Sequence, residues 1–294
     1  AKRMLIITPG DALRRYVAGI LPSLDVGGVP IRTFPAFAQE SVKRLVPALK
    51  KRKPTDETPM GARRLKRHPV LLDLIAQLIR EEARAWDAPI EQAGGPAVLR
   101  AWVSRRNLPP VVRVERTLDW LTKNAEKAGL RGGSLVAARK ALQQARRELG
   151  DPVETWAELL TDRGRLAAAL DAAKAPYYQW ELDQLINTAS LQVEAPLNLQ
   201  DYDPSHREGV DGRALDHGEL QGRLDVDDCA ILLRICQLKY GAMTGPSGQR
   251  LRFGHVVVDE AQDLSPLSIQ VLCGLVPEDG PVTLAGDTAQ RLVM

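Results

Sequence analysis

Two carboxylates stand side by side near the end of this sequence, at Asp259 and Glu260. They directly follow three valines at 256–258, and such a compact apolar run is typical of a short buried strand. Ligands of open α/β sheets bind outside the carboxyl ends of the strands. An adjacent acidic pair in that place suits a divalent cation and a water molecule that the cation polarises. The pair therefore predicts a metal-assisted site at a strand tip.

A second unit of the same kind follows at residues 281–290, PVTLAGDTAQ. It is again a short apolar run that ends in a polar turn, and the turn carries Asp287 and Gln290. An acidic pair alone favours a solvated turn after a strand over a catalytic site. Two strand-and-tip units in tandem instead favour a nucleotide-triphosphatase core.

The stretch DEAQD at 259–263, followed by TLAGDTAQ at 283–290, resembles motifs II and III of the UvrD/Rep-like superfamily 1 helicases, whose ATPase core is RecA-like. The resemblance implies that Asp259 binds the Mg²⁺ of bound ATP and that Glu260 orients and deprotonates the attacking water. Gln290 would sense the γ-phosphate and couple it to DNA, with Asp287 in support. Gln262 and Asp263 complete the motif as coupling residues. Phosphoryl transfer depends on such positioning and charge neutralisation.

Two earlier strand ends resemble the segments of this family that contact single-stranded DNA. Thr8-Pro9, which closes the apolar run at 4–8, resembles motif Ia, and Arg32-Thr33-Phe34 resembles motif Ib. Core packing is the alternative role for Phe34. The stretch at 8–24, TPGDALRRYVAGILPSL, is more similar to the HelD-like branch, whose members are ATPases that bind bacterial RNA polymerase.

Residues 43–67 are rich in lysine and arginine, with Lys50, Lys51, Arg52 and Lys53 in one run. Prolines and a glycine interrupt any helix there, which predicts an exposed, mobile basic loop. Such a loop could neutralise DNA phosphates, with strong salt dependence. A solvated surface without a ligand is the alternative. No aromatic residue is interleaved, so a base-stacking platform is not predicted.

Most of the remaining chain has helical periodicity. Residues 69–190 predict helices near 70–79, 96–106, 113–128, 134–150, 152–160, 164–174 and 177–190, and a turn-rich stretch at 191–226 leads into an apolar helix capped by Asp227 and Asp228. The large aromatic residues are expected to anchor the core between helices; they are Trp86, Trp102, Trp120, Trp156, Trp180, Tyr177 and Tyr178.

These elements predict an α/β fold. By the resemblance, the sheet is part of a RecA-like P-loop NTPase domain that a large, mostly helical insertion interrupts. The core would take residues 1–40 and 227–294, and the insertion would take 41–226. In HelD-like proteins an enlarged insertion at this place reaches into the polymerase.

The phosphate-binding loop of the family is missing from the sequence, which contains no Gly-Lys dipeptide. Both ends look cut, so we expect a fragment whose P-loop lies upstream of Ala1 and whose second RecA-like domain is absent. The 294-residue chain alone is therefore expected not to hydrolyse ATP. In RecA-like sheets the P-loop strand lies beside the motif III strand. Residues 281–286 should then expose a sheet edge, which a neighbour, another copy or a peptide would cover.

Composition adds few constraints. The net charge of +3 gives no global argument for polyanion binding, and 44% hydrophobic with 26% charged residues is ordinary for a soluble protein. The cysteines, Cys229, Cys236 and Cys273, lie in apolar contexts without metal-ligand spacing, which predicts free thiols in the cytoplasm and makes zinc unfavoured. No apolar run is long enough for a membrane span.

Three hypotheses from different classes remain. The first is part of an ATP-dependent DNA helicase or translocase acting on single-stranded DNA. The second is a HelD-like ATPase that binds RNA polymerase through its helical insertion. The third is a non-catalytic nucleic-acid or protein-binding module that keeps the acidic motif as structure.

Overall fold

In the described part of the chain, strands from the early and the late sequence pair in one four-stranded, all-parallel sheet. The computed structural model describes residues 4–24, 27–195 and 220–287. The strands are β1 (Met4–Thr8), β2 (Ile31–Thr33), β3 (His255–Val258) and β4 (Val282–Leu284), in the order β2-β1-β3-β4. The predicted α/β class and the pairing of early with late strands are confirmed.

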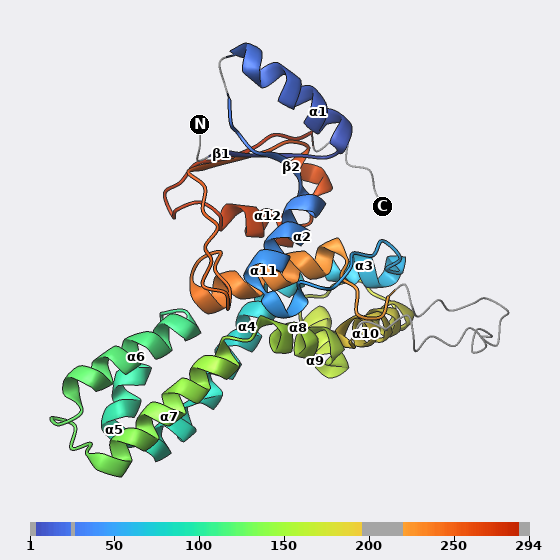
Figure 1. Ribbon diagram of the computed structural model, residues 1–294. Coiled ribbons are helices and arrows are strands. Elements are labelled where there is room, and N and C mark those ends of the chain that lie inside the picture. Colours follow the sequence, from blue (N-terminus) through green and yellow to red (C-terminus); the bar gives the residue numbers. More distant parts are fainter. Residues whose placement is uncertain (1–3, 25–26, 196–219, 288–294) are drawn as a thin grey trace.

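Helices cover both faces of this sheet (Figure 1). Helix α1 (Asp11–Ile20) lies over one face, and α2 (Phe34–Leu45) and α12 (Pro266–Cys273) lie on the other, beside α11 (Val226–Tyr240). Helix α11 is buried along nearly its whole length, and Gly241 ends it with a φ of 74°. The left-handed conformation favours glycine at that position.

The helical body packs on α11 and shares one hydrophobic core with the sheet. It consists of α3 (Met60–Lys66), α4 (Val70–Ala85), α8 (Pro152–Thr161), α9 (Arg163–Ala172) and α10 (Gln179–Val193). Helix α8 begins as predicted, because the Asp151 carboxylate accepts hydrogen bonds from the backbone N–H groups of Val153 and Glu154, at 2.8 and 3.4 Å. At α11 the prediction was wrong in part: Asp225 is the N-cap, paired with Asp228, and Asp227 does not cap.

Helices α5 (Asp87–Val103), α6 (Pro110–Asn124) and α7 (Gly132–Leu149) form an arm that projects from the body (Figure 1). The arm has a core of its own, which includes Trp102, Val114, Leu121 and Leu142. Helix α5 is broken at Gly95, whose φ is 72°, just ahead of the predicted helix start at 96. The stretch at 41–226 is therefore helical where it is described, but it packs as two units. Its boundaries as a single domain stay a prediction.

Strand β4 lies at the edge of the sheet and pairs only with β3 among the described residues. Leu284 on this strand is 49% exposed. The open edge expected at 281–286 is thus confirmed for this part of the chain, while the partner that would cover it stays a prediction. No helix in the described ranges is long and apolar enough to cross a bilayer.

Candidate active site at the carboxyl edge of the sheet

The parallel sheet brings the predicted strand-end residues to one edge. Thr8 ends β1 and Thr33 ends β2, directly opposite each other in the register, and Asp259 follows β3. The Asp259 N–H donates to the Ile7 carbonyl at 2.9 Å, which fixes the turn after β3 against β1. The acidic pair therefore lies beside a central strand, at the edge where α/β sheets bind ligands.

Glu260 has a strained backbone. Its φ of 50° and ψ of 46° lie in the left-handed region, which a residue with a side chain adopts at a cost of about 1–2 kcal/mol. The Glu260 N–H donates to Asp259 Oδ1 at 3.0 Å, and Gln262 Nε2 donates to Glu260 Oε2. Both acids are half-buried. Such strain concentrates at functional sites, because the surrounding contacts must hold it in place.

Gln262 joins the two motif segments. Its Oε1 accepts from the Asp287 N–H at 3.2 Å, while its Nε2 holds Glu260. The backbone strengthens this junction, since the Ala261 N–H donates to the Ala285 carbonyl at 2.9 Å. A Cβ at Gly286 would lie 2.3 Å from Gln262 Oε1, so a side chain at residue 286 would displace the Gln262 amide from this position. Gln290, predicted to sense the γ-phosphate, lies outside the described residues.

The edge can serve a magnesium nucleotide only in part. Mg²⁺ is usually bound by one or two carboxylates, by waters and by substrate phosphates. Asp259 and Glu260 fit that requirement. No group of three or more metal-ligating side chains occurs in the described ranges, so an all-protein metal cage is not formed there. The chemistry that these acids support is binding of a hydrated cation and polarisation of a water molecule.

The predicted DNA contacts at strand ends divide into exposed and buried residues. Pro9 and Arg32 are exposed, and Arg32 lies 3.8 Å from the Glu40 carboxylate. Thr33 accepts a hydrogen bond from the Ala36 N–H and so caps α2. Thr8 is only 1% exposed, and its hydroxyl donates to the Gly10 carbonyl at 3.4 Å, so its side chain is not accessible to DNA in this structure. Phe34 is only 3% exposed and belongs to the main core. The packing alternative therefore describes Phe34, whose ring is not accessible to a base in this structure.

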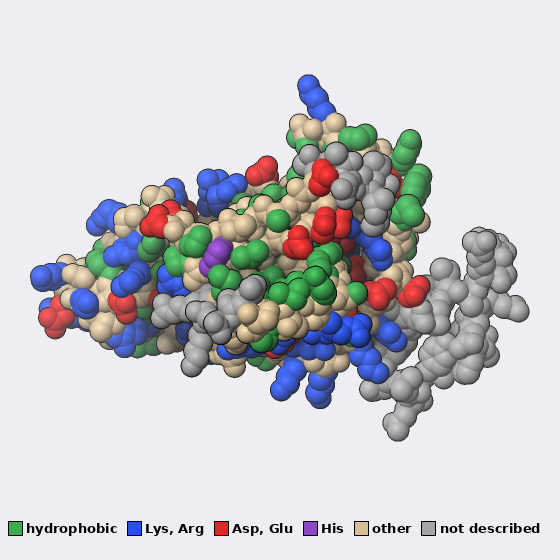
Figure 2. All heavy atoms as spheres, turned by 90° about the horizontal axis from the view of Figure 1, so that it is seen from above, with side chains coloured by type: hydrophobic (Ala, Val, Ile, Leu, Met, Phe, Trp, Pro, Cys, Tyr) green, Lys and Arg blue, Asp and Glu red, His purple; other side chains and the backbone are tan. Residues whose placement is uncertain are grey.

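The prediction of an exposed loop over 43–67 was wrong in part, because α2, α3 and a 3₁₀ turn occupy much of it. Lys50, Lys51 and Lys53 are exposed as expected. Arg52 is half-buried: its guanidinium donates to the carbonyls of Gln192 and Val193 and lies 5.9 Å from the centre of the Trp156 ring. On the face that Figure 2 shows, lysine and arginine side chains are spread over the arm and along the body.

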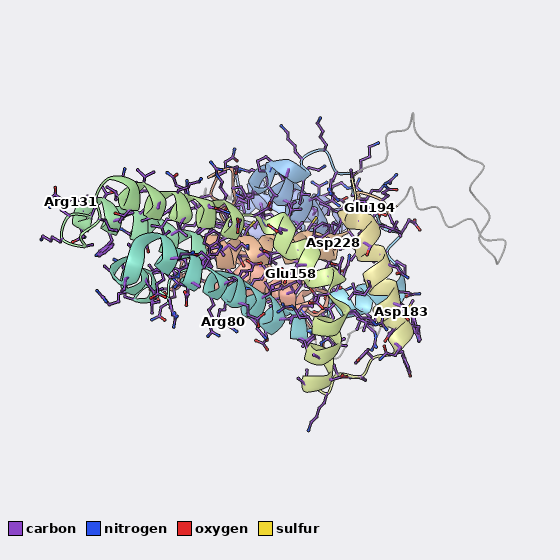
Figure 3. All side chains as sticks on the ribbon, turned by 90° about the horizontal axis from the view of Figure 1, so that it is seen from below. Arg80, Arg131, Glu158, Asp183, Glu194 and Asp228 are labelled. Carbon is purple, nitrogen blue, oxygen red and sulfur yellow. The ribbon has the colours of Figure 1, made fainter. Side chains whose placement is uncertain are left out.

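Lys66, from the same basic stretch, is completely buried. Its Nζ donates to Asp228 Oδ1 at 2.6 Å, Gln192 Oε1 at 2.7 Å and Asp225 Oδ2 at 2.8 Å. Burial alone would raise the pKa of Asp225, but the Lys66 ammonium outweighs it and lowers that pKa to about 2. Burial and the Asp225 charge raise the pKa of Asp228. In Figure 3, Asp228 lies in the middle of the helical body. This cluster joins α3, α10 and α11 and is structural.

The large aromatic residues follow the prediction only in part. Trp102 and Trp156 are fully buried core anchors. Tyr178 and Trp180, at the start of α10, are instead 66% and 52% exposed. Their rings are nearly parallel, with centroids 6.1 Å apart and 12° between the planes. This exposed pair was missed, because the periodicity of a short helix does not show which of its turns faces solvent.

No protein-family model matches this chain, and a search of the curated proteins finds no match. What this chain can do is therefore inferred from its residues and from the geometry of the sheet edge.

Proposed function

We propose that this chain forms the first RecA-like domain of a UvrD/Rep-like superfamily 1 ATPase, a helicase or translocase that moves on single-stranded DNA. One observation carries the proposal: Gln262 bonds at once to Glu260 of the first motif and to the backbone of Asp287 in the second. This connection is not expected in a solvated turn. It is expected in a motor in which both segments sense the nucleotide.

The roles follow from the positions of the side chains. Asp259 would hold Mg²⁺ and Glu260 would orient and deprotonate the attacking water, because both acids follow a central strand. Gln262 fixes the Glu260 carboxylate and transmits its position to residue 287. Gln290 would contact the γ-phosphate. When ATP is bound, the Mg²⁺ ion supplies neutralisation of the phosphate charge.

The order of the strands gives a second line of support. In this family the P-loop strand lies beside the strand of motif III, and here that strand is β4, with its outer side unpaired within the described residues. A P-loop segment from upstream of Ala1 could add to this edge. It would bring its phosphate-binding backbone next to Asp259 and Glu260.

ATP hydrolysis tests the proposal. The purified 294-residue chain should be inactive, and a longer chain that also contains a P-loop segment and a second RecA-like domain should hydrolyse ATP. Glu260→Gln in the longer chain should lower kcat by about 10²–10⁴-fold, as expected for loss of a general base. Glu57→Gln, at an exposed glutamate, is the matched control. Unchanged activity of the Glu260→Gln variant would refute the assignment of the site.

Binding of single-stranded DNA tests the substrate. Each phosphate contact that is lost should reduce the slope of log K against log salt by about 0.7. Alanine at the exposed Lys50, Lys51 and Lys53 should therefore flatten the slope by about 2. The control removes three exposed charges from the arm: Arg139, Lys140 and Arg147. Equal effects of the two triple variants would show that no local DNA site exists in the basic stretch.

The arm favours a second candidate, a HelD-like ATPase that binds RNA polymerase. Helices α5–α7 have their own hydrophobic core and extend away from the sheet (Figure 1). A protein-binding extension is expected to have this construction. Capture of RNA polymerase by the full chain, but not by a chain whose residues 87–149 are replaced with a short linker, would favour this candidate. A non-catalytic module predicts that no P-loop sequence precedes Ala1.

A further inference from the structure

A depression lies at the amino end of the sheet, opposite the acidic pair. It forms where α11 and α12 end, where β4 begins and where α6 of the arm starts. Its volume is about 480 Å³, within the usual range of about 300–1,000 Å³ for small-molecule sites. Its lining includes Arg234, Gln237, Cys273, Glu278, Pro109 and Val276.

Arg234 is the residue of this depression that indicates a bound ligand. It is half-buried, and its Nε is buried without a hydrogen-bond partner. Desolvation lowers the pKa of Arg234, and no acid in the described part of the chain forms an ion pair with it. A desolvated cation without a counter-ion is unfavourable for folding. A bound anion would remove this cost.

The guanidinium is held ready for such a ligand. Arg234 Nη1 donates to Gln237 Oε1 at 3.2 Å, and Gln237 Nε2 donates to the Val271 carbonyl of α12 at 2.8 Å. Gln237 is only 6% exposed, so its amide has little freedom. Because its position is fixed before binding, Arg234 would lose little conformational entropy when it pairs with an anion.

The remaining lining selects the body of the ligand. Apolar side chains, including Pro109, Leu238, Val276 and Pro277, form much of the wall. Glu278 also lines the depression and would oppose an anion that approached it. The fit is thus to a compact molecule with one anionic group at Arg234 and an apolar body.

We propose that this depression is a binding site for a small organic anion, a carboxylate or phosphate on an apolar body, with Arg234 as its charge-pairing residue. The site is separate from the candidate nucleotide site, which lies at the opposite ends of the same strands. Pro109 and Gly241 meet in its wall, where a Cβ on Gly241 would lie 2.7 Å from Pro109 Cγ. A ligand there would contact both the arm and the sheet domain.

Calorimetric titration of the 294-residue chain with phenyl phosphate tests the site. We expect phenyl phosphate to bind saturably, inorganic phosphate to bind more weakly, and phenol not to bind. Arg234→Gln should weaken binding of phenyl phosphate by about tenfold or more, since a hydrogen-bonded charge is lost. Arg252→Gln, at an exposed arginine outside the depression, should leave it unchanged. Binding of phenol as tight as that of phenyl phosphate, or equal binding by the two variants, would overturn the proposal.

Two further measurements separate binding from misfolding. Glu278→Gln should tighten binding of phenyl phosphate several-fold, an effect that damage to the fold cannot produce. Cys273 lines the depression and is partly exposed, whereas Cys229 and Cys236 are buried. Alkylation of Cys273 by N-ethylmaleimide should slow as phenyl phosphate saturates, but not with phenol at the same concentration. Unchanged alkylation at saturation would place the ligand elsewhere and refute the site.

Discussion

Replacement of Lys66 by methionine tests how the helical body is held together. The substitution keeps the length and the apolar stem of the side chain but removes the ammonium group. That group is completely buried and donates to Asp225, Asp228 and Gln192. Without it, two carboxylates remain in the core, and Arg52, whose charge interacts with Asp228, donates its hydrogen bonds to the carbonyls of Gln192 and Val193 instead.

The expected loss is large. Removing one partner of a buried ion pair costs about 3–5 kcal/mol, because the remaining charge is left uncompensated. Uptake of a proton by Asp228, whose pKa burial already raises, would keep the loss near the lower limit. We therefore expect Lys66→Met to reduce the free energy of unfolding by about 3 kcal/mol near neutral pH.

The sign of the pH dependence follows from Asp225. Its pKa falls from 3.8 to about 2 in the folded state. An acid with a lowered pKa contributes stability above its unfolded value, and this stability is lost as pH falls from 3.8 toward 2. The difference between wild type and Lys66→Met should therefore shrink in that acidic range. It should be fully present at neutral pH.

Urea unfolding followed by tryptophan fluorescence measures the effect, because Trp156 donates to Asp228 at 3.2 Å and so reports on the cluster. Lys51→Met, at an exposed lysine, is the matched control and should change stability by less than about 0.5 kcal/mol. The triple variant Lys66→Met, Asp225→Asn, Asp228→Asn should recover most of the loss. A change below about 1 kcal/mol for Lys66→Met would refute the reasoning.

Two other predictions concern Asp227 and the edge of the sheet. Asp227 is 5% exposed, and burial, followed by the Asp225 charge, raises its pKa from 3.8 to about 6. The folded state therefore binds a proton more tightly than the unfolded state, and the free energy of unfolding falls as pH rises from 3.8 to about 6. Asp227→Asn should remove that fall in a urea series across pH and add roughly 2–3 kcal/mol above pH 6, whereas Asp56→Asn, at an exposed acid, should do neither. Leu284→Lys, on the open strand β4, should reduce self-association in light scattering, because an edge lysine opposes strand pairing. Leu108→Lys, on the arm, should leave self-association unchanged. If both lysine variants reduced self-association equally, association through β4 would be excluded.

Local signals in the sequence were sufficient to predict most of the elements. The Asp-Pro-Val-Glu run at 151–154 contains its own cap and helix start, and the structure confirms both. The three valines before Asp259 predict a strand, because an apolar run that ends abruptly in charge has few other uses. The same signals placed the acidic pair at the carboxyl edge, since parallel strands end on one side.

Contacts between distant residues could not be predicted in this way. Lys66 and Arg52 were interpreted as exposed because lysine and arginine are rarely buried without a partner. Their partners lie far along the chain, at Asp225, Asp228 and the carbonyls of Gln192 and Val193. The bond from Gln262 to Asp287 is equally invisible in the sequence, where the two residues are 25 positions apart.

Helix α11 has hydrogen bonds both to the segments that flank the arm and to the helix that follows the candidate site. Lys239, near its end, donates to Glu82 of α4 at 2.7 Å, and the Tyr240 hydroxyl donates to the Gly150 carbonyl after α7 at 2.7 Å. The segments that flank the arm on both sides are thus bonded to the last turn of α11. Gln237, in the same turn, donates to the Val271 carbonyl of α12, which begins at Pro266, shortly after the DEAQD stretch. If the proposed ATPase function holds and nucleotide binding shifts that stretch, the shift could pass to the arm through α12 and the buried helix α11. If the arm binds a partner, α11 is the element through which that binding could change the position of Glu260.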